Sequence, residues 1–132
     1  MKYSGVVLDH IYSPRNGYRM ADADAVGMAG EPGRGPFMVL YLKLDGDTIA
    51  KASFQTYGCI PAIAAGSVLT EGITGATLGE AAGWTDSRID EALGGLPSDK
   101  RRCANLAADA LAAARIDAIR TRRIPLDGGR PF

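Results

Sequence analysis

Apolar residues in the first half of the chain favour strands. The run 37–44 is almost continuously apolar, and the run 48–57 alternates between apolar and polar residues, as neighbours in an antiparallel sheet often do. The three residues between them, 45–47, contain the Asp-Gly pair typical of a hairpin turn. A further short strand is predicted before Gly30, in a stretch otherwise typical of a loop. On the returning strand, three residues are predicted to share the core-facing side: Ala50, Ala52 and Phe54.

Helical spacing appears at the N-terminus and dominates after residue 59. Apolar residues recur every three or four positions in a short N-terminal segment and in several later ones. Strands first and helices afterwards predict an α+β fold, in which a small antiparallel three-stranded sheet carries helices on one face. The predicted helices cover 3–12, 62–72, 77–82, 87–93 and a long C-terminal segment from 97 or 98 to about 120. The apolar face of that last helix comprises Cys103, Leu106, Ala107, Ala110, Leu111 and Ala114.

Length and charge narrow the class of protein. The 132 residues suit a single domain, 1–132, and the basic end, 120–132, is expected to be less ordered. The 15 basic and 15 acidic residues cancel, so no nucleic-acid partner and no membrane association are expected. The uncharged stretch 52–70 contains Pro61 and several polar residues, and it is interpreted as a buried strand followed by a helix. No signal peptide is evident, and a cytoplasmic location is predicted.

Both cysteines lie where a helix is predicted to begin. Cys59 follows Gly58 and precedes Pro61, a residue suited to the first turn of a helix. Cys103 follows Arg102 at the start of the last helix. Helix N-termini and arginine neighbours both favour a thiolate, which is the form that binds metals and attacks other groups. The alternative is that each cysteine is a small core residue, and the occurrence of two in similar settings favours a functional pair.

Catalytic motifs are not apparent. The chain has no recognisable Ser-His-Asp set, no carboxylate pair at a telling spacing and no dinucleotide-binding fingerprint. Its single histidine, His10, is expected to be a packing residue in the N-terminal helix. The chain is therefore predicted not to be an enzyme.

Several segments, in order along the chain, match a known pattern. They are Asp9-His10-Ile11-Tyr12-Ser13-Pro14-Arg15-Asn16-Gly17, the run Tyr57 to Ala64 with Ser67 and Thr70-Glu71, the run Gly75 to Ala81, and the run Leu93 to Leu111. Together they resemble the IscU/NifU N-terminal-type iron–sulfur cluster assembly scaffold family over roughly residues 3–119. The resemblance implies that Cys59 and Cys103 are two of the cluster and metal ligands. It also implies iron or an iron–sulfur cluster as the bound group.

Three positions depart from the family pattern. The family carries a cysteine and an aspartate just before the central strand and a histidine beside its last cysteine. Arg34, Pro36 and Arg102 stand at those positions here. Arginine stays protonated and is not a practical metal ligand. The resemblance therefore indicates a divergent member with an incomplete ligand set, in which these three residues modify the site.

The resemblance also implies partners. A cysteine desulfurase and a chaperone-type assembly protein are expected, and a homo-oligomer could pool ligands from two chains. The expected partner loop consists of Leu96, Pro97, Ser98, Asp99 and Lys100.

Three functional hypotheses remain open. In the first, the chain is a scaffold-like protein that carries sulfur or iron, docks assembly partners, or holds a cluster only across a dimer. In the second, Cys59 and Cys103 form a metal-free thiol or disulfide pair. In the third, the chain is a non-enzymatic module in which Arg34 and Arg102 bind an anion or an acidic partner.

Overall fold

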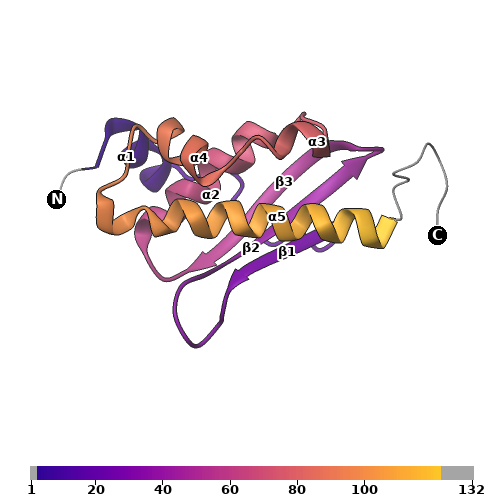
Figure 1. Ribbon diagram of the computed structural model, residues 1–132, viewed down its shortest axis with the longest axis horizontal. Helices are drawn as coiled ribbons and strands as arrows, with labels where there is room; N and C mark the ends of the chain where they lie inside the picture. Colours follow the sequence, from indigo (N-terminus) through magenta and orange to yellow (C-terminus); the bar gives the residue numbers. More distant parts are fainter. Residues whose placement is uncertain (1–2, 123–132) are drawn as a thin grey trace.

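The computed structural model describes residues 3–122 (Figure 1). The expected less ordered tail lies outside the described residues from 123 onward, and residues 120–122 belong to the last helix. The elements follow in the order α1 (Gly5–Tyr12), β1 (Ala25–Gly30), β2 (Phe37–Asp45), β3 (Thr48–Tyr57), α2 (Ile60–Ile73), α3 (Leu78–Ala81), α4 (Asp86–Ala92), the 3₁₀ helix η1 (Ser98–Lys100) and α5 (Arg102–Arg122).

The three strands form one antiparallel sheet in the order β1-β2-β3. Helix α5 packs along β1 and β2, and α2 packs on β3, with the two helices in contact (Figure 1). The α+β class, the third strand and the presence of a long C-terminal helix are confirmed. Its predicted start at 97 or 98 is wrong, because residues 98–100 form the separate 3₁₀ helix η1 and α5 begins at Arg102. Within residues 3–122, no helix combines the length and apolar character needed to cross a lipid bilayer.

The predicted face of β3 is wrong at one position. Ala52 and Phe54 are buried as expected, but Ala50 is exposed and Ile49 is buried instead. The register with β2 shifts beside Leu44, so β3 carries one extra residue there. Such a bulge reverses the inward and outward alternation for the residues beyond it.

Strand β1 and helix α5 pack with their backbones almost in contact. A Cβ atom on Gly27 would lie 2.1 Å from the Ala114 nitrogen and 2.4 Å from the Ala110 carbonyl oxygen. Only a residue without a side chain permits this approach. The small residues along the buried face of α5 serve the same close packing.

A hydrogen-bond network holds α1 and its following turn on α2. The His10 Nδ1 atom lies 2.6 Å from the Ser67 hydroxyl, which accepts the Arg15 backbone N–H at 2.9 Å. The hydroxyl is therefore best placed to donate to Nδ1, and the Arg15 guanidinium is a second donor, 3.3 Å from that atom. This network assigns a neutral imidazole with its proton on Nε2, facing Glu71.

We expect Gly27→Ala to lower the free energy of unfolding by about 1–3 kcal/mol, because the new methyl group must push α5 away from β1. Urea denaturation measures the change. Gly5→Ala is the matched control, since a Cβ there meets nothing within 4 Å, and it should leave stability unchanged or slightly raised. Equal stability of the two variants would contradict the close packing.

Stability should fall as the pH drops below the ordinary histidine range. Burial lowers the pKa of His10 and the Arg15 guanidinium lowers it further, against weaker opposing effects of Glu71 and Asp9. The unfolded chain, with a pKa near 6.5, then binds the proton more readily than the folded chain. The contribution of neutral His10 to stability is complete above pH 6.5. It is lost as the pH falls through the lower pKa that His10 has in the folded state.

The measurement is urea unfolding at several pH values between 7.5 and 5.5. One titrating group changes the free energy of unfolding by at most about 1.4 kcal/mol per pH unit. His10→Gln removes the titrating group and should flatten the profile over this range. A wild-type profile as flat as that of the variant would refute the assignment.

Candidate functional site

Cys59 lies at the junction between β3 and α2. It is the residue at the N-cap of α2, in an extended conformation, and its side chain makes no capping hydrogen bond. Gly58 has φ 126°, and a Cβ there would lie 2.6 Å from the Pro36 Cβ. The chain therefore turns from strand to helix over a glycine packed tightly against Pro36. This arrangement leaves the Cys59 side chain half-exposed.

Cys103 is the second residue of α5 and is only 1 % exposed. The chain reaches it through the break at Gly94 and Gly95, both with positive φ, followed by the turn η1. The expected position of both cysteines at helix starts is thus confirmed.

The two sulfur atoms meet. The Cys59 and Cys103 Sγ atoms are 2.6 Å apart, because the N-terminal ends of α2 and α5 converge. A small cavity of about 140 Å³ opens beside them and is lined by Pro36, Cys59, Arg102, Cys103 and Leu106. The sequence predicted these two thiols as a pair, and the fold brings them together.

The pKa of Cys103 is raised, whereas the sequence predicted that its arginine neighbour and its helix start would lower it. Burial and the contact with Cys59 raise the pKa of the Cys103 thiol to about 12. Arg102 and Lys100 act in the expected downward direction, but their effect is smaller. The loss of solvation outweighs the positive charges, so Cys103 is a protonated thiol at neutral pH.

The three residues expected to modify the site lie in different places. Pro36 and Arg102 both line the cavity beside the sulfurs. The Arg34 side chain is 79 % exposed, donates to the Glu31 carboxylate at 3.2 Å and does not line that cavity. The anion pocket considered for Arg34 and Arg102 together therefore has only Arg102 beside the thiols.

The expected partner loop is anchored at one end and open at its centre. Leu96 is buried, and its backbone N–H donates to the Asp90 carboxylate at 2.8 Å. Ser98 and Asp99 are exposed in the turn η1. Arg101, just beyond the loop, also pairs with Asp90, at 3.5 Å. Asp90 thus fixes both flanks of a surface loop that leads directly into Cys103.

The described residues that line the cavity include two thiols and no carboxylate or imidazole. In the part of the chain that the structure describes, no group of three or more His, Cys, Asp or Glu side chains is arranged to hold a metal ion. His10 is occupied by Ser67 and Arg15 between α1 and α2. Two thiols alone do not satisfy an iron–sulfur cluster or a zinc ion, which need about four ligands.

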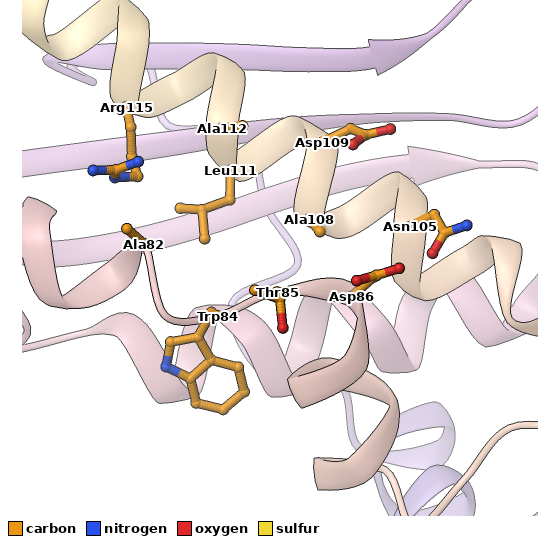
Figure 2. Close-up of a pocket in the computed structure, with 10 residues that line it drawn as sticks. All are labelled: Ala82, Trp84, Thr85, Asp86, Asn105, Ala108, Asp109, Leu111, Ala112 and Arg115. Carbon is orange, nitrogen blue, oxygen red and sulfur yellow. The ribbon is translucent and has the colours of Figure 1, made fainter.

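A larger cavity, not foreseen from the sequence, lies between α5 and the α3–α4 connection (Figure 2). It measures about 490 Å³, and its walls include Trp84, Leu111 and Arg115, with Asp86 and Asp109 toward the other end. No cysteine or histidine lines it. The sequence feature that could have pointed to this cavity is Trp84, the single tryptophan, which lies between two short predicted helices.

Comparison with known proteins places these features in a family. Residues 2–123 match the NifU-like N terminal domain. Two iron–sulfur cluster assembly scaffold proteins of Archaeoglobus fulgidus, IscU 1 and IscU 2, are each 47 % identical over 118 residues, covering 89 % of this chain and 77 % of theirs. The scaffold protein IscU of Haemophilus influenzae is 42 % identical, with 89 % and 95 % covered. Scaffold proteins are not enzymes, in agreement with the prediction for this chain.

Solved structures show the same fold at lower sequence identity. A putative scaffold protein for the SUF system from Fervidobacterium islandicum superposes with a TM-score of 0.69 at 21 % identity, covering 86 % of this chain and 96 % of that one. A NifU-like N-terminal protein from Brucella abortus gives 0.54 at 18 % identity, covering 92 % and 87 %. From the match over residues 2–123 and the identity to its relatives, the chain belongs to the NifU-like N-terminal domain family.

Proposed function

We propose that this chain takes part in iron–sulfur cluster assembly in the cytoplasm, as a scaffold-like carrier with an incomplete ligand set. The observation that carries the proposal is the convergence of Cys59 and Cys103, 2.6 Å apart at the starts of two helices. Relatives 47 % and 42 % identical are described as iron–sulfur cluster assembly scaffolds. Iron, sulfide and the cluster assembled from them are the cargo of such a protein.

Each chain contributes half of a cluster site. Cys59 and Cys103 supply two thiolates, and a [2Fe–2S] cluster takes about four ligands. Two chains that face each other at these thiols supply all four. The cluster is then held across a dimer, with Arg102 beside each pair in place of a ligand.

Access to the pair is one-sided. Cys59 is half-exposed and Cys103 is buried, so an incoming iron ion or sulfur donor meets Cys59 first. The exposed residues Ser98 and Asp99 belong to the loop that enters α5 at Cys103. We assign that loop, Leu96 to Lys100, to an assembly partner of the chaperone type, and the thiol pair to a cysteine desulfurase.

A second function has one observation in its favour. Two thiols in direct contact can form a disulfide with little movement of the chain. In this alternative the pair cycles between dithiol and disulfide and binds no metal. Oxidised glutathione would accept the two electrons and become two molecules of reduced glutathione.

The cluster hypothesis predicts a dimeric holoprotein. Anaerobic reconstitution of the full chain with iron and sulfide should give a coloured species with about one [2Fe–2S] cluster per two chains, because four thiolates come from two chains. Visible absorption, iron content and sedimentation measure this. The triple variant Arg34→Cys, Pro36→Asp, Arg102→His restores the family pattern. Without the Arg34–Glu31 ion pair, the loop that carries position 34 is free to turn toward the sulfurs, and the variant should hold a cluster in one chain.

Arg101→His is the matched control for the triple variant. Arg101 pairs with Asp90 and does not line the cavity, so a histidine there should leave cluster binding unchanged. A wild-type protein that stays colourless and free of iron in every oligomeric state would disprove the cluster hypothesis.

The thiol-pair hypothesis predicts unequal reactivity and joint oxidation. At pH 7–8, iodoacetamide should modify Cys59 before Cys103, because a pKa near 12 reduces the Cys103 thiolate by roughly a hundredfold or more. Mass spectrometry with Cys59→Ser and Cys103→Ser assigns the rates. Oxidised glutathione should remove both free thiols without joining two chains. Two thiols that both survive this treatment would exclude a redox pair.

A further inference from the structure

We propose that Cys59 and Cys103 of a single reduced chain form a two-coordinate site for one soft, monovalent metal ion of the Cu(I) class. This inference does not rest on the proposed function, since it requires neither a second chain nor a cluster. Its basis is the donor set. The cavity beside the thiols offers two sulfur atoms and no carboxylate or imidazole.

The number of donors discriminates between metals. Zinc takes four ligands in structural sites and three plus water in catalytic ones, and iron in clusters is bound by about four protein ligands per cluster. Thiolates bind Cu(I), zinc and iron–sulfur clusters alike, so the number of donors decides. Cu(I) is the ion among these that two thiolates can satisfy, in a nearly linear arrangement. Two sulfurs without a third donor therefore suit Cu(I) better than Zn²⁺ or Fe²⁺.

The cavity walls reinforce this choice. Pro36 and Leu106 provide apolar surface beside the sulfurs. Pro36 is held in place by its close contact with Gly58. Hard ions would need water or other oxygen ligands to complete their coordination, and an apolar wall disfavours both.

The charge of the site favours a monovalent ion. When the ion enters, the two thiols release two protons, and the resulting bis-thiolate complex carries one negative charge. Arg102 lines the cavity, and among residues 3–122 it has no ion-pair partner, whereas Arg101 pairs with Asp90. The N-terminal ends of α2 and α5 add partial positive charge. A divalent ion would give a neutral complex and gain less from these charges.

The metal requires a small rearrangement of one side chain. A linear sulfur–metal–sulfur unit places its sulfurs roughly 4.6 Å apart, taking about 2.3 Å per bond as for zinc thiolates. The sulfurs are now 2.6 Å apart. Cys103 is buried in α5, but the Cys59 side chain is half-exposed and not hydrogen-bonded to the helix it caps. Rotation of Cys59 into the adjacent cavity can supply the separation.

The test is an anaerobic titration of the reduced full chain with Cu(I), supplied as its bicinchoninate complex. We expect transfer of one Cu(I) per chain, protection of both thiols from a disulfide reagent, and no change in oligomeric state. X-ray absorption should show two sulfur neighbours and no nitrogen or oxygen neighbours. Zn²⁺ and Fe²⁺ at the same concentration should not survive gel filtration with the protein.

The variants separate this site from unspecific binding. Cys59→Ala and Cys103→Ala should each weaken Cu(I) binding at least a hundredfold, with folding checked by circular dichroism. Arg102→Gln should weaken it several-fold, and Arg101→Gln, the matched control, should leave it unchanged. Three or four sulfur neighbours, more than one ion per chain, equal retention of Zn²⁺, or unaltered binding in either cysteine variant would each overturn the proposal.

Discussion

The close packing of α2 and α5 on the sheet is the constraint on which the site depends. At Gly27 the backbone of β1 nearly touches that of α5, and at Gly66 of α2 a Cβ would lie 2.5 Å from the Phe54 ring. These two approaches fix the depth and direction of both helices. Because each cysteine lies at the beginning of one of them, the same packing determines where the sulfurs meet.

Burial and charge oppose each other at the thiol pair, and burial prevails. Arg102 and Lys100 favour a thiolate at Cys103, but the removal of the thiol from water raises its pKa by more than these two positive charges lower it. A thiol in such a position stays protonated at neutral pH. It loses its proton only to a metal or a reaction partner that stabilises the thiolate in place of water.

Most of the fold, and the two cysteines that form the thiol pair, could be predicted from the sequence. Long periodic segments and the matched motifs predicted α5, the hairpin and the convergence implied by the family. The sequence could not predict the burial of Ile49 in place of Ala50, because a bulge depends on strand register and not on local pattern. It could not place Arg34 either, since a long side chain in a glycine-rich loop takes its direction from nearby partners such as Glu31. The pKa of Cys103 depends on burial, which only the packed structure reveals.

The separation of the two cysteines along the chain has a topological consequence. Cys59 and Cys103 are 44 residues apart, and the segment between them contains α2, α3 and α4. Any bond that joins the sulfurs, directly or through a metal, closes a loop around three helices. In the chain-entropy description, a closure of this length stabilises the folded state by about 4 kcal/mol. Whether the two sulfurs are joined would thus change the stability of a segment that makes up a third of the chain.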